Sequence, residues 1–257
     1  MTAVESMNAI LRSVEQATGK PVVIEVDPSL PLHATLTIAR EDMPVHIVRY
    51  RAAFEPERAY LVSYQCGFIL RHTQAGPNHQ FDLIATQAGR AEVESAIRYQ
   101  LSRNKQSLPD KVLRGLRDRM YDGLGLQLRS IGPGLRVDNW IAIQYPALAE
   151  QQRVAVVRQL NENARSLGPE VKEITPYKIL APSLAMNAAF SLFFSRLWND
   201  PLVTEPYRSS GQMTKGEELI RKFDAIPTEP ENDMRLIEAW SQVLEIGLWY
   251  SLTPKSA

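Results

Sequence analysis

The sequence predicts an α+β protein, in which a small N-terminal sheet packs on a central helix and a mostly helical part follows. Three short runs rich in β-branched residues, all within the first fifty positions, predict about three strands. Beyond them, apolar residues recur mainly at helical spacing. Separation of strands from helices along the chain favours α+β over a doubly wound fold. We expect an α+β part at 1–106 and a helical part at 107–257, packed together as one compact unit.

The N-terminal elements follow from local patterns. Residues 4–17 form an amphipathic helix, and Gly19 just after it is the expected terminator. Strands are expected at 22–26, 33–39 and 45–50. The short polar turn between the second and third strands favours an antiparallel pair.

The stretch from Tyr60 to His72 predicts the most buried helix of the protein. Glu55-Pro56-Glu57 precedes it, and proline with acidic residues suits a first helical turn. Its apolar residues lie almost all round the helix, which is typical of a helix packed on several sides. Gly67 within it costs roughly 1 kcal/mol relative to alanine. We therefore expect another backbone to approach the helix closely at Gly67.

The rest of the chain is predicted to be helical, with no strand after residue 50. Glycine and proline at Gly123, Gly125 and Gly132-Pro133-Gly134 predict a break or bend. Residues 201–214 are expected to form a loop. The aromatic residues of the helix near 190 are typical of core rather than of a cofactor site. Helices are expected at 86–104, 108–128, 147–167, 176–199, 214–223 and 231–250.

Composition sets limits on the partners. The chain has 44% apolar and 23% charged residues, and its 29 basic and 29 acidic residues give zero formal net charge. No global charge therefore favours nucleic acid or an anionic membrane, although a local patch stays possible. The single cysteine, Cys66, suits a reducing compartment. Without a signal pattern or an apolar run of roughly 18 residues, a cytoplasmic protein with no membrane contact is expected.

The central helix has the frame of a zinc-binding helix without its ligands. A buried helix after short strands, with Gly67 near its centre, resembles the ImmA/IrrE-type zinc metallopeptidases, whose helix carries His-Glu-x-x-His. Tyr64 and Phe68 occupy the histidine positions, and Gln65 occupies the glutamate position. Phenylalanine has no lone pair for zinc, tyrosine is a poor ligand, and glutamine cannot accept a proton from water. The resemblance covers the first third of the chain and implies a non-catalytic relative without metal or cofactor.

The family's third metal ligand comes from a later helix. The apolar face of residues 183–198 contains no acidic residue, and Asn187 is the nearest polar group. This departure agrees with loss of the metal, and it agrees equally with the absence of any relationship.

An enzyme whose site is assembled from distant residues is a second possibility. No pair of the four histidines has metal-ligand spacing, so His46 and His72 would have to converge in space. No Gly-x-Ser-x-Gly motif occurs, and Cys66 lies among apolar residues without a sign of activation.

A nucleic-acid-associated protein is a third possibility, because residues 103–129 are locally basic. Arg114, Arg117 and Arg119 are the expected contacts with phosphate groups. A solvated helix with internal ion pairs explains the same pattern. Tyr121 is the only aromatic residue in the stretch, which weakens an interpretation as a single-strand site.

The leading hypothesis is a non-catalytic, peptidase-fold-like binding or regulatory protein of a bacterial-type cytoplasm. Its vestigial pocket would comprise Tyr64, Gln65, Phe68 and His72, and would serve a ligand or partner or simply be filled. A protein partner is expected, but the sequence does not identify it.

Overall fold

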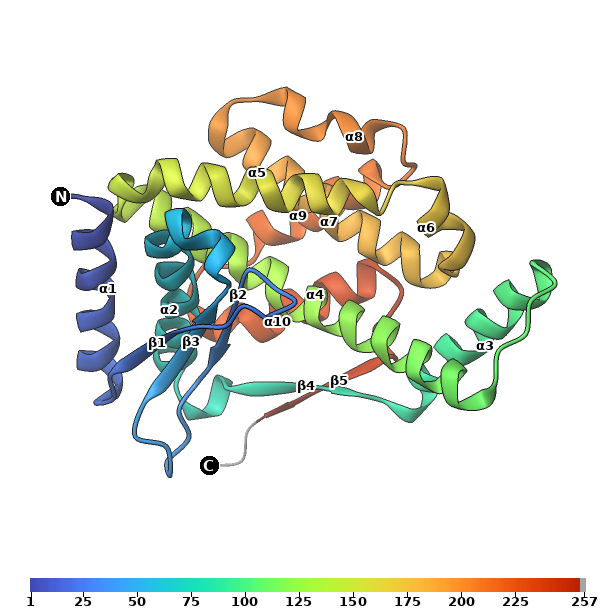
Figure 1. Cartoon of the computed structure of the whole chain (residues 1–257), viewed down its shortest axis with the longest axis horizontal. Coiled ribbons are helices and arrows are strands. Elements are labelled where there is room, and N and C mark those ends of the chain that lie inside the picture. The colour runs from blue at the N-terminus through green and yellow to red at the C-terminus, as the bar shows by residue number, and fades with distance from the viewer. Residues whose placement is uncertain (255–257) are drawn as a thin grey trace. The chain divides into compact units, whose positions relative to one another are not determined.

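A computed structural model describes residues 1–254, which form two compact units (Figure 1). The first unit contains residues 1–77 and 134–159, and the second contains residues 78–133 and the chain from Leu160 onward. The α+β class is confirmed. The unit boundaries do not coincide with the expected division at residue 107, because two long helices each contribute residues to both units.

The first unit is built on a three-stranded mixed sheet with strand order β1-β3-β2. Strands β1 and β3 are parallel, with Val22 opposite His46. Strands β2 and β3 are antiparallel, with Ala34 opposite Tyr50, as the short turn between them predicts. The strands are β1 (Val22–Val26), β2 (Ala34–Thr37) and β3 (His46–Tyr50).

Two helices accompany this sheet, α1 in blue and α2 in teal in Figure 1. Helix α1 (Ala3–Thr18) starts with a capping box at Thr2 and ends at Gly19, whose φ of 70° places it in the left-handed region. Helix α2 (Arg58–Gln74) follows the 3₁₀ turn η1 (Ala52–Glu57). It packs against α1, β2 and β3. Nine of its 17 residues are buried, so α2 is a core helix. The prediction that it is the most buried helix is wrong, because 14 of the 22 residues of α7 (Tyr177–Trp198) are buried.

A break or bend is predicted near residue 130, and the break is wrong. Helix α4 (Asp110–Gln144) continues for 35 residues through Gly132-Pro133-Gly134. Every residue from Gly132 to Asp138 is buried, and a Cβ on Gly132 would lie 3.1 Å from Leu236 Cδ2. Packing therefore stabilises a helical stretch that local propensity disfavours.

The second unit contains a sheet that the sequence analysis missed. Strands β4 (Phe81–Ala85) and β5 (Tyr250–Pro254) form an antiparallel pair, with Ala85 opposite Tyr250. The prediction of no strand after residue 50 is wrong. Each of these two short segments becomes a strand only by pairing with a segment more than 160 residues away in the sequence, which local patterns do not reveal. The last predicted helix is correspondingly shorter, since α10 (Asp233–Val243) ends before the strand begins.

Helices make up most of the second unit. Helix α7 (Tyr177–Trp198) is long and apolar enough to cross a membrane, but 72% of its apolar window is buried inside the fold, as in the core helix of a globular protein. Part of the loop expected at 201–214 is helical. The other elements are η2 (Pro77–His79), α3 (Gln87–Arg103), η3 (Pro146–Leu148), α5 (Ala149–Arg165), α6 (Pro169–Ile174), η4 (Pro201–Thr204), α8 (Glu205–Arg208), α9 (Met213–Ala225) and η5 (Pro230–Asn232).

Candidate functional site

The positions that would carry zinc ligands in a peptidase form an aromatic ladder along α2. The Tyr60 and Tyr64 ring centroids are 5.9 Å apart, and Phe68 meets Tyr64 edge-on at 5.3 Å. A Cβ on Gly134 of α4 would overlap Tyr64 Oη and would lie 3.5 Å from Phe68 Cζ. Both rings thus pack against the α4 backbone instead of lining an open cleft.

The mid-helix glycine of α2 is explained by the same neighbour. A Cβ on Gly67 would overlap Val137 Cγ1 and would lie 3.1 Å from Val137 Cγ2. The close approach expected at Gly67 is present, but a side chain of α4 makes it.

The buried carboxyl group of Asp138 lies at the Tyr60 end of this ladder. Tyr60 Oη donates a hydrogen bond of 2.7 Å to Asp138 Oδ1, and Gln152 Nε2 donates one of 2.9 Å to the same oxygen. Burial raises the pKa of Asp138 to about 7, against the lowering effect of these two donors. Burial also raises the pKa of Tyr60 well above its ordinary value, so its hydroxyl remains a donor. The cluster joins α2, α4 and α5 within the first unit.

The other α2 residues with polar or potentially reactive side chains include Gln65, Cys66 and His72. Gln65 and His72 are half-buried on α2. Burial raises the pKa of the Cys66 thiol to about 12, so this cysteine stays protonated and is a poor nucleophile.

The His46 side chain forms hydrogen bonds within the first unit through both of its ring nitrogens. Ala39 N–H donates to Nδ1 at 3.0 Å, so the ring proton lies on Nε2, which is 3.1 Å from Thr18 Oγ1. Burial, and then the charge of Lys20, lowers the pKa of His46. Both ring nitrogens are therefore engaged. Within residues 1–254, no three His, Cys, Asp or Glu side chains lie close enough to hold a metal ion.

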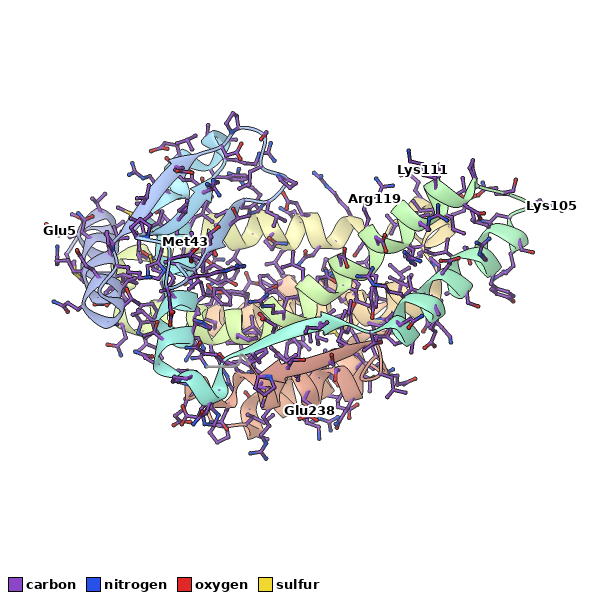
Figure 2. All side chains as sticks on the ribbon, turned by 90° about the horizontal axis from the view of Figure 1, so that it is seen from below. Glu5, Met43, Lys105, Lys111, Arg119 and Glu238 are labelled. Atoms are coloured by element: carbon purple, nitrogen blue, oxygen red, sulfur yellow. The ribbon has the colours of Figure 1, made fainter. Side chains whose placement is uncertain are left out.

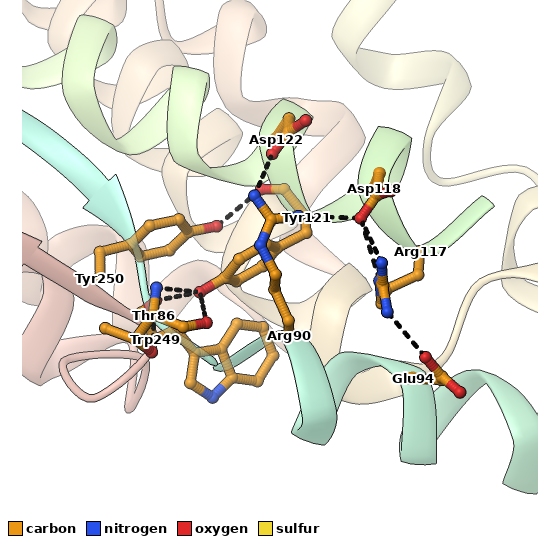
Figure 3. A network of polar contacts seen from close by, with 9 residues as sticks. All are labelled: Thr86, Arg90, Glu94, Arg117, Asp118, Tyr121, Asp122, Trp249 and Tyr250. Carbon is orange, nitrogen blue, oxygen red and sulfur yellow. Dashed lines mark hydrogen bonds and ion pairs between the residues drawn. The ribbon is translucent and has the colours of Figure 1, made fainter. Parts of the chain in front are cut away.

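A second set of polar contacts connects α3, α4 and β5 in the second unit (Figure 3). Thr86 caps α3 by accepting from Gly89 N–H at 3.0 Å, and its own N–H bonds to Tyr121 Oη at 3.1 Å. Tyr121 also donates to the Trp249 carbonyl and stacks on the Tyr250 ring at 4.9 Å. Tyr121 is fully buried and cannot stack on a ligand.

The ion pairs of this region determine which arginine side chains could contact a phosphate group. Arg117 bonds to Glu94 at 2.8 Å and to Asp118 at 2.9 Å, and its side chain is only 18% exposed. Arg90 bonds to Asp118 at 2.8 Å. Arg117 therefore has a structural role, unlike its predicted neighbours Arg114 and Arg119.

We call residues 87–133 the α3–α4 hairpin. Its exposed cations include the labelled Lys105, Lys111 and Arg119 (Figure 2). In the part of the chain that the structure describes, no ion pair involves the exposed cations Arg103, Lys105, Lys111, Arg114, Arg119 and Arg129.

A groove of about 350 Å³ lies between α3 and the start of α7. Two tyrosines with highly exposed side chains line it, Tyr99 at 68% and Tyr177 at 71%. Arg103 lines it as well. Sequence reasoning missed this groove because its two walls are more than seventy residues apart. The only local signal is an aromatic residue, Tyr99, on the polar face of an amphipathic helix.

Polar contacts hold the two walls of this groove together. Gln100 Nε2 and Asn104 Nδ2 both donate to the Glu173 carbonyl, at 2.7 and 3.1 Å. Lys178 bonds to Glu92 at 2.8 Å. Since these contacts span α3, α6 and α7, the groove is formed before any ligand binds.

Comparisons with known proteins give no relative for this chain. No protein-family model matches it, and no curated protein or solved structure matches it with significant similarity.

Proposed function

We propose that this protein is a non-catalytic binding or regulatory protein with a degenerate peptidase-like α2 helix. The observation that supports it is the packing of Tyr64 and Phe68 against α4 at Gly134. Residues at these positions contribute packing, and they offer neither a metal ligand nor a general base. Binding would then use a surface other than the vestigial pocket.

Metal content and hydrolysis together test this proposal. We expect elemental analysis of the purified protein to find metal far below one equivalent, before and after incubation with zinc. We also expect no cleavage of an unfolded protein substrate. The His72→Ala variant is the control, and it should behave like the parent. Near-stoichiometric metal that is lost in His72→Ala, or zinc-dependent cleavage, would overturn the proposal and favour an enzyme assembled from distant residues.

Of the two histidines in the enzyme alternative, His46 is the less suitable metal ligand or catalytic group. Its two ring nitrogens are already used by Ala39 and Thr18. A His46→Ala variant would therefore lose stability before it reported on chemistry, so a fall in metal content in this variant counts only if its melting temperature is unchanged.

Contact with nucleic acid through the α3–α4 hairpin is a second candidate function. The six exposed cations without ion pairs favour it, because unpaired Lys and Arg side chains are free to neutralise phosphates. We still expect Arg114 and Arg119 to contact phosphate groups. We no longer expect this of Arg117, because it forms ion pairs with Glu94 and Asp118.

Salt-dependent retention tests this second candidate. The Arg114→Ala/Arg119→Ala double variant should elute from immobilised DNA at lower salt than the parent. Its matched control is Arg221→Ala/Lys222→Ala, which removes two exposed cations from α9 in the same unit. Equal elution of both double variants would contradict a role of the hairpin, since only net charge would then matter.

A further inference from the structure

We propose that the groove between α3 and the start of α7 binds single-stranded nucleic acid, with bases stacked on Tyr99 and Tyr177 and a phosphate at Arg103. This inference rests on the second candidate function. It adds a site outside the predicted contacts and names the form of nucleic acid that the site takes.

The two tyrosine rings are exposed in a way that packing does not explain. Tyr99 is 68% exposed and Tyr177 is 71% exposed, and both line the same groove. Clustered apolar groups on a folded surface mark binding sites more often than scattered ones do. Tyrosine and arginine are also the residues most enriched where partners bind tightly.

The Tyr177 ring is held in its exposed position. Gln212 Nε2 lies 3.1 Å from Tyr177 Oη, and Gln212 itself is only 5% exposed. A buried amide thus fixes the hydroxyl end of the ring, while the ring remains on the surface. An aromatic platform that is already oriented loses less conformational entropy when a ligand binds.

The charge of the groove selects an anionic ligand. Glu92, the acidic side chain of the lining, is neutralised by Lys178 at 2.8 Å and also accepts from Trp249 Nε1 at 2.9 Å. Arg103 in the lining has no ion-pair partner among the described residues, and the equally unpaired Lys105 follows two positions later. Positive charge therefore continues from the groove onto the hairpin.

Base stacking selects a single strand over a duplex. The faces of bases in a duplex are covered by neighbouring base pairs, whereas a single strand can present them to aromatic side chains. Proteins that bind single strands combine a basic surface with aromatic platforms, and here Tyr99, Tyr177 and Arg103 line one preformed groove. An acidic peptide would satisfy Arg103 and Lys105 but would leave the two rings without planar partners.

Fluorescence anisotropy tests the inference with a labelled oligothymidylate of about 15 nucleotides, a length within the range that one binding module covers. We expect Tyr99→Ala and Tyr177→Ala each to weaken binding about tenfold, because each variant loses the stacking of one base. Tyr99→Phe keeps the ring and should bind like the parent. Arg103→Ala should lower the slope of log affinity against log salt by about 0.7, the value for one phosphate contact on a single strand.

A duplex of the same length, heparin and polyglutamate are the comparison ligands. Loss of oligothymidylate affinity in the tyrosine variants, with heparin binding unchanged, supports the inference. If Tyr99→Ala and Tyr177→Ala bind like the parent while Arg114→Ala/Arg119→Ala does not, the groove assignment fails and the hairpin candidate stands. If the parent binds no oligonucleotide, both fail. If polyglutamate competes as well as oligothymidylate, the groove is an acidic-peptide site and the inference is overturned.

Discussion

Helices α2 and α3 have the same length, 17 residues, but nine residues of α2 are buried and only three of α3. In α2 the Tyr60 side chain turns inward and donates to the buried Asp138. In α3 the polar groups turn outward, and Arg103 and Tyr99 meet solvent. The residues of α2 that occupy the zinc-ligand positions of the resembled peptidases pack inside the first unit, whereas α3 exposes Tyr99 and Arg103 on its surface.

This difference separates two kinds of residue. A side chain that is buried and hydrogen-bonded, such as Tyr60, should change stability when it is replaced. A side chain that is exposed and forms no ion pair, such as Arg114, should leave stability almost unaltered when it is replaced. Replacing a buried residue should therefore change the free energy of unfolding, and replacing an exposed residue without an ion pair should not.

The largest effect is expected at Asp138. Its folded-state pKa is raised from 3.8 to about 7, so its contribution to stability is fully present below pH 3.8 and is lost as the pH rises through about 7. The shift corresponds to about 4 kcal/mol. Asparagine cannot ionise, so Asp138→Asn avoids the stability that the parent loses when the buried carboxyl group becomes charged. The variant should therefore be more stable than the parent at pH 8. Urea denaturation between pH 4.5 and 8.5 measures the difference as a function of pH.

His46 acts in the opposite direction and must be separated from this effect. Its folded-state pKa is lowered, so its contribution is present above the unfolded value of 6.5 and is lost as the pH falls through the lowered pKa. The difference between the parent and Asp138→Asn cancels the His46 contribution. A difference that stays constant from pH 4.5 to 8.5 would show that Asp138 is not buried as described.

A smaller effect is expected at Gly67. An added Cβ would overlap Val137 Cγ1, and a β-branched side chain on a helix has few rotamers by which to move away. Overpacking costs about 1–3 kcal/mol, which exceeds the gain of roughly 1 kcal/mol from alanine in a helix. Gly67→Ala should therefore lower the free energy of unfolding by about 1–2 kcal/mol.

Gly115 provides the matched control, because it also lies in a helix but has no atom within 4 Å of an added Cβ. Gly115→Ala should raise the free energy of unfolding by about 0.5–1 kcal/mol. Adding Val137→Ala to Gly67→Ala should recover part of the loss that the overlap causes. Stabilisation by both glycine replacements would contradict the close contact between α2 and α4.

The smallest effects are expected on the α3–α4 hairpin. Arg117→Ala removes contacts to Glu94 and Asp118 and should cost about 0.5–1 kcal/mol, while Arg114→Ala should stay within about 0.5 kcal/mol of the parent. Chemical denaturation of the two variants at one salt concentration measures both values. Equal losses would mean that Arg114 has a structural partner, and would weaken the hairpin as a binding surface.

Patterns within about twenty residues predicted most elements of the fold. The alternating and β-branched runs before residue 50 gave three strands, and helical spacing gave α1, α2, α3 and α7 close to their observed bounds. Errors occurred where distant contacts decide the outcome. Strand β4 pairs with a segment near the C-terminus, and α4 continues through Pro133 because the residues around it are buried. Local propensity contains neither kind of information.

The candidate sites divide in the same way. The sequence alone shows that the two histidines and the glutamate of His-Glu-x-x-His are replaced by Tyr64, Phe68 and Gln65, none of which can do the original chemistry. Which arginines stay free was decided by tertiary structure, since Arg114 and Arg117 look alike in sequence and only Arg117 meets Glu94. The groove at Tyr99 and Tyr177 likewise exists only after α3 and α7 come together. Chemical identity is fixed residue by residue, whereas burial, pairing and exposure depend on neighbours that folding brings from elsewhere in the chain.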